Sequence, residues 1–299
     1  NLQAFLYLKN ESGEALTDIT PIRPACNRLK VGTFKIDAHN TKLGERFVKK
    51  ILDTALDMKA EEIYVTIYPK HEGLIRILQR YGFNEEGKKG EELVLVKNMK
   101  ILTGDILKDF PLLTTKDKRK FLLSIYPKYH TKMFPDSILR NEESKKYELV
   151  KDVSYTNSIH KVYLCFMSDT AKLQRGDIIA IYRTKDDKGS ARYRSVITSI
   201  CQIEEVKTNK DFPTVEDFLA YTNFYSIFDS EELKQWYQQK NCYILKMTYN
   251  IALTKRVTNG YLVDNLNMSP KYWGFFQLTD EQFDAILKKG EVDEGVIID

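Results

Sequence analysis

Hydrophobic positions in the first hundred residues follow two patterns in turn. Short runs rich in β-branched and aromatic side chains predict strands at Ala4–Lys9, Arg28–Ile36, Glu62–Pro69 and Glu91–Asn98. Hydrophobic residues recur at helical spacing from Gly44 to Met58 and again from Leu74 to Tyr81, where Gly82 would end the helix. The order strand, loop, helix, strand, helix, strand predicts an α/β layer structure with a parallel pair of strands at its centre.

The pattern changes after Lys100. A polar segment introduces the apolar run Phe121–Tyr126, and Asn141–Val153 has the charged composition of a loop or linker. Strand patterns then recur at Lys161–Phe166, Asp177–Arg183, Ser195–Val206 and Cys242–Tyr249. Helices are expected near Val215–Tyr221, Ser230–Gln239 and Asp280–Lys288. Short strands bounded by turn residues predict a small barrel-like sheet.

These patterns divide the chain into two domains, as its length of 299 residues favours. The first domain covers 1–100, a linker and the start of the second domain cover 101–155, and the second domain covers 156–299. The longest apolar runs, such as Ile178–Tyr182, are too short to cross a bilayer. The four cysteines form no CxxC pair, and three lie in apolar strand-like runs typical of buried thiols. We therefore expect a soluble cytoplasmic protein, with no cluster of residues at metal-binding spacing.

Basic residues are concentrated at the start of the second half. Lys and Arg outnumber Asp and Glu by 11 to 6 in 108–151 and by 8 to 4 in 160–194. Aromatic residues are interleaved with these cations, a combination that suits single-stranded nucleic acid because cations neutralise phosphates while rings stack on bases. The candidate nucleic-acid-binding residues are Tyr129, Lys161, Tyr182, Arg183, Arg192 and Arg194.

An alternative reading assigns the tyrosines to the sheet and the cations to its solvated surface. The two tryptophans, Trp236 and Trp273, are expected to be buried anchors rather than parts of a ligand cage.

A second candidate site lies where the strand Arg28–Ile36 runs through a loop into the helix that starts near Gly44. Backbone N–H groups at a helix N-terminus point outward, and the helix dipole favours a bound anion. Gly44 would let the backbone approach a pyrophosphate, and Lys42 would add a positive charge.

This passage resembles the cofactor motif of the GNAT superfamily of N-acetyltransferases, Q/R-x-x-G-x-G/A. Gly44 fits the last position, whereas His39 and Lys42 replace the Q/R and the first glycine. Leu74–Phe83 resembles the closing helix of that family, with its Gly82-Phe83 pair, and Glu62–Pro69 resembles the strand that splays from its neighbour to admit the pantetheine arm. The resemblance implies acetyl-CoA as cofactor, in contact with Phe34, Ile36, His39, Asn40, Thr41, Lys42, Leu43, Gly44, His71 and Leu78.

Two departures bear on the chemistry implied by this resemblance. Many GNAT enzymes carry a proton-donating tyrosine where this chain has Leu78, and an asparagine where it has His71. Tyr81, three residues round the helix, is then the candidate proton donor. The resemblance also covers only the later part of a GNAT domain, so we expect its opening elements, and a further N-terminal domain, to lie outside this chain. The alternative to an acetyltransferase is a non-catalytic scaffold or CoA sensor in an RNA-binding protein.

The second domain resembles another superfamily. Leu173–Arg183 has a basic-Gly-Asp turn, an apolar strand and a tyrosine, similar to a stretch of the PUA-like domains that include ASCH and EVE domains. That resemblance implies a mainly β pseudo-barrel whose ligand is RNA or a modified base. The expected fold is thus an α/β GNAT-like domain followed by a PUA-like domain.

Overall fold

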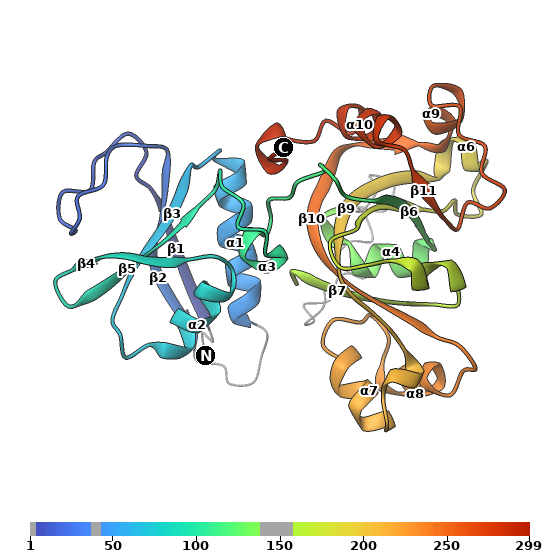
Figure 1. Cartoon of the computed structure of the whole chain (residues 1–299), viewed down its shortest axis with the longest axis horizontal. Coiled ribbons are helices and arrows are strands. Elements are labelled where there is room, and N and C mark those ends of the chain that lie inside the picture. The colour runs from blue at the N-terminus through green and yellow to red at the C-terminus, as the bar shows by residue number, and fades with distance from the viewer. Residues whose placement is uncertain (1–3, 37–42, 138–157) are drawn as a thin grey trace. The chain divides into compact units, whose positions relative to one another are not determined.

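The chain folds as two compact units, as shown by a computed structural model that describes residues 4–36, 43–137 and 158–299 (Figure 1). The first unit comprises Asn1–Thr114 together with Glu294–Asp299, and the second comprises Thr115–Asp293. The first unit thus extends beyond the boundary predicted at residue 100. The predicted linker at Asn141–Val153 lies outside the described residues.

A five-stranded mixed sheet forms the first unit, in the order β1-β2-β3-β5-β4. Its strands are β1 (Ala4–Asn10), β2 (Arg28–Ile36), β3 (Glu62–Ile67), β4 (Asn84–Lys89) and β5 (Glu92–Asn98). β2 and β3 run parallel, as predicted, and the other neighbours are antiparallel. The sequence did not predict β4, which has no hydrophobic side chain and is held by its pairing with β5.

The helices of this unit are α1 (Leu43–Asp57), α2 (Glu72–Arg80) and the short α3 (Ile106–Asp109). α1 buries Val48, Ile51, Leu52 and Ala55, the stripe that gave it helical spacing. Gly82 follows α2 and its C-cap Tyr81; its φ of 87° suits glycine best, and a Cβ there would lie 2.2 Å from the Lys108 carbonyl oxygen. Gly82 therefore both ends the helix and admits the backbone of α3.

The C-terminal residues complete this unit. The Leu113 N–H donates to the Val296 carbonyl at 3.0 Å, and the Ile298 N–H donates to the Leu113 carbonyl at 2.9 Å. The Thr114 hydroxyl also bonds the Asp299 carboxylate at 2.6 Å. The chain leaves the first unit after Thr114 and returns to it at Glu294.

A six-stranded mixed sheet forms the second unit, in the order β11-β6-β8-β9-β10-β7. Its strands are β6 (Lys120–Ile125), β7 (His160–Cys165), β8 (Ile178–Arg183), β9 (Val196–Thr208), β10 (Tyr243–Thr258) and β11 (Phe275–Leu278). β6 and β8 are parallel, and the other pairs are antiparallel. Within the described residues this sheet is open, with β11 and β7 as its edges, where the sequence predicted a barrel.

The α-helices of the second unit are α4 (Pro127–Met133), α6 (Ala191–Arg194), α7 (Val215–Thr222), α8 (Ser230–Tyr237), α9 (Asn259–Asp264) and α10 (Asp280–Lys289). Short 3-10 turns lie at Pro135–Ser137, Ser168–Lys172 and Asn209–Asp211. A capping box starts α8, in which Asp229 accepts from the Glu232 N–H and Glu232 accepts from the Asp229 N–H. A second box, Thr279 with Gln282, starts α10.

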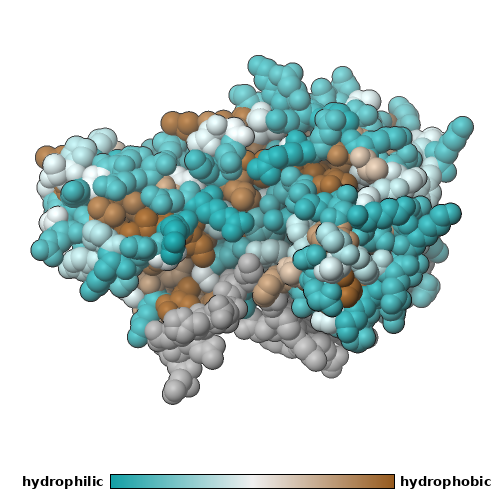
Figure 2. Space-filling view, turned by 60° about the horizontal axis from the view of Figure 1, so that its bottom comes forward, coloured by the Kyte–Doolittle hydropathy of each residue, from teal (hydrophilic) through white to brown (hydrophobic). Residues whose placement is uncertain are grey.

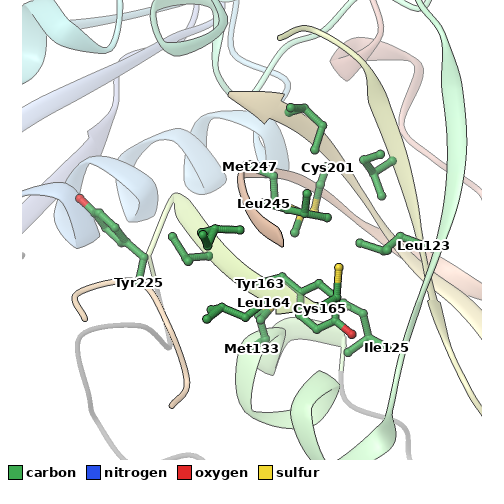
Figure 3. Packing of buried hydrophobic residues seen from close by; sticks show 14 of the residues in the cluster. Leu123, Ile125, Met133, Tyr163, Leu164, Cys165, Cys201, Tyr225, Leu245 and Met247 are labelled. Carbon is green, nitrogen blue, oxygen red and sulfur yellow. The ribbon is translucent and has the colours of Figure 1, made fainter. Parts of the chain in front are cut away.

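One hydrophobic core joins the sheet of the second unit to α4, α7 and α8. Figure 3 shows side chains from β6, β7, β9 and β10 in this cluster, with Met133 of α4 among them. Cys165, Cys201 and Cys242 are buried free thiols, as predicted, and Cys26 is a half-buried free thiol. Hydrophilic residues cover most of the face in Figure 2, with smaller hydrophobic areas between them. No helix in the described parts of the chain is both long and apolar enough to cross a membrane.

Candidate functional site

An open pocket of about 730 Å³ lies in the second unit, and half of the residues that line it are aromatic. The lining residues are Ser124, Tyr126, Lys128, Tyr129, Tyr163, Leu164, Cys165, Phe166, Met167, Thr184, Trp236, Tyr272, Trp273 and Gly274. Both tryptophans of the chain are among them. Both side chains are half-buried, so neither is the fully buried anchor that the sequence predicted.

The curl of the sheet explains how distant segments share this pocket. Cys165 comes from the edge strand β7, whereas Ser124 comes from β6 and Gly274 directly precedes the other edge strand, β11. Since β7 and β11 are the two edges of a six-stranded sheet, the sheet must curve for both ends to line one pocket. α4 starts directly after β6, with Pro127 at its first position, and brings Lys128 and Tyr129 to the same wall.

Trp273 is fixed in place by β6 and β8. The Ser124 hydroxyl donates to the Trp273 carbonyl, and the Ser124 N–H donates to the Gly274 carbonyl at 2.8 Å. The indole stacks on the Tyr182 ring, with centroids 5.5 Å apart and planes inclined by 25°. Because its backbone and one ring face are held, Trp273 offers a pre-positioned aromatic surface.

The second tryptophan comes from α8. The centroid of the Trp236 ring lies 4.5 Å from that of the Phe166 ring, with the planes inclined by 24°, and 5.4 Å from that of the Phe228 ring. The Phe228 and Tyr129 ring centroids are 5.2 Å apart, so the segment just before α8 contacts α4. The aromatic wall is thus continuous from β7 through α8 to α4.

The charges around the pocket favour neutral or anionic ligands. Among the described residues the lining contains no carboxylate and one cation, Lys128, whose ammonium lies 4.5 Å from the Tyr129 ring centroid. Burial raises the pKa values of the Tyr163 phenol and the Cys165 thiol, so both groups are neutral at physiological pH. A cationic ligand would find no counter-charge in this lining.

Polar groups in the wall are few. The Thr184 hydroxyl oxygen is buried and has no hydrogen-bond partner among the described residues, while the Thr184 N–H donates to the Ile125 carbonyl at 3.0 Å. Because the Thr184 backbone is held while its hydroxyl has no protein partner among the described residues, this hydroxyl is suited to form a hydrogen bond with a ligand.

The predicted nucleic-acid-binding residues separate into three groups. Tyr129 lines the pocket, and Tyr182 supports Trp273 from behind, with 3% of its surface exposed. Lys161 and Arg183 are 0% exposed, which contradicts the prediction that they present their cations at the surface. Both lie on strands that are buried on both faces.

Arg192 and Arg194 are accessible but paired. Arg192 forms a bidentate ion pair with Asp264, and Arg194 forms one with Asp186. These carboxylates neutralise the two guanidinium groups, so the basic balance of 160–194 overstates the charge open to a phosphate.

The predicted cofactor residues of the first unit are spread over four segments. His39, Asn40, Thr41 and Lys42 lie outside the described residues. Phe34 and Ile36 lie at the end of β2, and Leu43 and Gly44 begin α1. A Cβ on Gly44 would lie 2.8 Å from Ile77 Cδ1 and 3.6 Å from Ile36 Cδ1. The start of α1 therefore lies against the end of β2 and against α2.

The predicted residues of α2 differ in exposure. His71 precedes the helix and is exposed, whereas Leu78 and Tyr81 are 0% exposed. Because both side chains are buried in the fold, Tyr81 as proton donor and Leu78 as a cofactor contact stay predictions.

The sequence interpretation did not select Phe166 or Tyr272, assigned Trp236 and Trp273 to the interior, and included Tyr126 only among the aromatics interleaved with cations. The signal for two of them was local, because Tyr126 follows β6 directly and Tyr272 stands next to Lys271 in a turn-rich segment. Trp236 gave no such signal, since its place on the pocket wall depends on the packing of α8.

No protein-family model and no curated protein matches the sequence of the chain. Among solved structures, ASCH from Zymomonas mobilis is similar with a TM-score of 0.38 and 9% identity, over 57% of this chain and 96% of that one. Human THYN1 protein, in complex with DNA containing 5-methylcytosine, is similar with a TM-score of 0.32 and 11% identity, over 59% of this chain and 99% of that one. TM-scores this low assign no function to the chain.

Proposed function

We propose that the second unit binds a base of a nucleic acid, RNA or a modified base, in its aromatic pocket. The observation that carries this proposal is the lining, which is half aromatic, has no carboxylate and contains both tryptophans. A planar, uncharged ring is the ligand that such a lining accepts best. Stacking of a base on an aromatic side chain contributes about 1–3 kcal/mol.

The floor of the pocket supports a preference for a base with an added methyl group. Leu164, Cys165 and Met167 are apolar residues of the lining, and the Cys165 thiol is kept protonated by burial. Burial of one methyl group contributes about 0.8 kcal/mol, which corresponds to roughly fourfold tighter binding. The Thr184 hydroxyl would bond a polar edge of the same ring.

Tryptophan fluorescence of the full chain tests this function, because both tryptophans line the pocket. Titration with uridine and 5-methyluridine, and with the other common nucleosides, should change the emission, with the methylated ligand about fourfold tighter. Tyr129→Leu should lose about 1–3 kcal/mol of binding and Thr184→Val about 0.5–1.5 kcal/mol.

Tyr193→Ala is the matched control, since Tyr193 is 72% exposed and does not line the pocket. Unchanged emission with every nucleoside at millimolar concentration would rule out the proposed function. So would equal losses in Tyr129→Leu and Tyr193→Ala.

We also propose that the first unit binds the pantetheine arm of acetyl-CoA, as an acetyltransferase or as a cofactor sensor. The supporting observation is the divergence of two central strands: β2 pairs with β3 only from Arg28 to Val31, opposite Glu62 to Val65. The rest of β2 pairs with β1 alone, so its other edge carries backbone groups that the β3 ladder does not use. An extended ligand with amide groups can bond such an edge.

Isothermal calorimetry with CoA tests this second function. Gly44→Glu places a carboxylate at the start of α1 and should abolish binding, because it repels the phosphates. Gly44→Gln is the matched control, since it has nearly the same size and crowds Ile77 equally but carries no charge. Equal loss in both variants would attribute the effect to crowding, and no binding by the unmodified chain at millimolar CoA would exclude the function.

A further inference from the structure

Two exposed tyrosines stand at the mouth of the aromatic pocket. Tyr126 and Tyr272 both line it, yet 65% and 63% of their surfaces are exposed. Large aromatic side chains on a protein surface are usually covered to a greater extent. These two rings therefore extend the aromatic lining from the pocket to the solvent.

The position of Tyr272 is set by a glycine. A Cβ on Gly274 would lie 2.1 Å from two atoms of the Tyr272 ring, so the ring lies directly over the Gly274 backbone. Gly274 itself is fixed by its carbonyl, which accepts from the Ser124 N–H at 2.8 Å. The exposed ring is thus held against β6 rather than extended freely into solvent.

Three lysines accompany the rim. Lys128 lines the pocket, Lys185 follows the lining residue Thr184, and Lys271 precedes Tyr272. All three are exposed, and none of them forms an ion pair within the described parts of the chain. Asp186, the carboxylate next to Lys185, is already held by Arg194. These lysines therefore add positive charge beside the pocket, where Glu232 is the carboxylate that acts on Lys128.

We propose that this rim binds nucleotides next to the pocket base, so that the ligand is a single-stranded segment rather than a free base. The inference rests on the proposed base-binding function. Tyr126 and Tyr272 each stack on one flanking base, while Lys128, Lys185 and Lys271 neutralise the connecting phosphates. Bases within a duplex already stack on their own neighbours, so only an unpaired strand can offer its faces to both rings.

The test compares three ligands on the full chain by tryptophan fluorescence: the best-bound nucleoside, a trinucleotide with that base in the centre, and a hairpin with that base in its stem. We expect the trinucleotide to bind at least tenfold tighter than the nucleoside, and the hairpin to bind more weakly than the trinucleotide. RNA and DNA forms of each ligand distinguish the two sources of the strand.

Variants of the rim separate this inference from the proposed function. Tyr126→Ala and Tyr272→Ala should each reduce trinucleotide affinity at least fivefold more than they reduce nucleoside affinity. Replacing the three rim lysines with glutamine should bring the slope of log affinity against log salt close to zero, from about −1.4 for the two connecting phosphates of the trinucleotide at roughly −0.7 each. Lys288→Gln is the control for charge, because Lys288 is exposed on α10, which contributes no residue to the lining.

Nucleoside binding without any gain for the trinucleotide would overturn the inference and leave the proposed function standing. A hairpin that binds as tightly as the trinucleotide would also overturn it. Absence of nucleoside binding, by contrast, counts against the proposed function itself. Binding of a proline-rich peptide in place of all nucleic-acid ligands would overturn both.

Discussion

The ring of Phe166 lies against the indole of Trp236, with centroids 4.5 Å apart and planes inclined by 24°. This contact joins the end of β7 to α8, which stands in the segment between β9 and β10. Phe166 is 58% exposed, so the stack closes one side of the pocket without being part of the core. Part of the binding wall is therefore held by a surface contact.

The first prediction concerns this stack. Phe166→Ala should cost only about 0.5–1.5 kcal/mol of folding free energy, because the aromatic pair contributes little beyond the area it buries. It should weaken nucleoside binding several-fold, since Trp236 loses the ring that orients it. Urea unfolding and fluorescence titration measure the two effects. A loss of stability beyond about 3 kcal/mol would show that Phe166 belongs to the core.

The second prediction concerns the pocket rim. Gly274→Ala should displace the Tyr272 ring, because a Cβ and this ring cannot occupy the same space. The ring is the end of an exposed side chain, so the melting temperature should change little. Trinucleotide affinity should fall as it does in Tyr272→Ala, and the double variant should lose no more than either single variant. Additive losses would show that Gly274 does not act through Tyr272.

The third prediction concerns acid stability. Burial, together with the nearby charges of Arg183 and Arg256, lowers the pKa of His130 from 6.5 to about 3. Between pH 6.5 and pH 3 the unfolded chain therefore takes up a proton at His130 that the folded chain does not. The free energy of unfolding must fall as the pH decreases through this range. The full loss is about 5 kcal/mol, at 1.36 kcal/mol per pKa unit.

His130→Gln should remove this contribution. The difference in unfolding free energy between the two proteins should shift in favour of the variant as the pH falls, as measured by urea unfolding with tryptophan fluorescence. Both tryptophans lie in the second unit with His130, so the signal reports the relevant transition. Parallel pH profiles would contradict the prediction.

The fourth prediction concerns the first unit at alkaline pH. Lys97 is 2% exposed, and burial lowers its pKa from 10.5 to about 8, against a smaller opposing effect of Asp109. Between these values the unfolded chain holds the proton that the folded chain has released, so stability rises with pH by about 3 kcal/mol in total. Lys97→Met should show no such rise.

Hydrogen exchange of the β5 amides is the suitable measurement, because the tryptophans do not report on the first unit. The comparison of Lys97→Met with the unmodified chain at each pH cancels the effect of the other lysines. An identical pH dependence in both would contradict the assigned pKa of Lys97.

Periodicity predicted those elements whose side chains have one buried face. α1 and α2 show hydrophobic residues at helical spacing, and β2, β3 and β5 were identified by their β-branched runs. β4 has the sequence NEEGKK and is a strand only because β5 supplies its partner. Such an edge strand is defined by tertiary pairing, which local sequence does not contain.

The same limit explains the errors at the candidate site. Lys161 and Arg183 stand on strands buried on both faces, where alternation no longer separates inside from outside. The charge balance treated Arg192 and Arg194 as unpaired cations, although they form ion pairs with Asp264 and Asp186. The pocket depends on the curl that brings β7 and the turn before β11 to one wall, and no spacing within the sequence encodes that approach.

The return of the chain to the first unit has a consequence for how the protein matures. Val296 and Ile298 bond Leu113, so the last backbone bonds of the first unit involve residues that leave the ribosome after the whole second unit. Domains that are contiguous in sequence can finish folding in the order of their synthesis. Here the second unit is an insertion, and it can reach its final fold while the first unit still lacks its last segment.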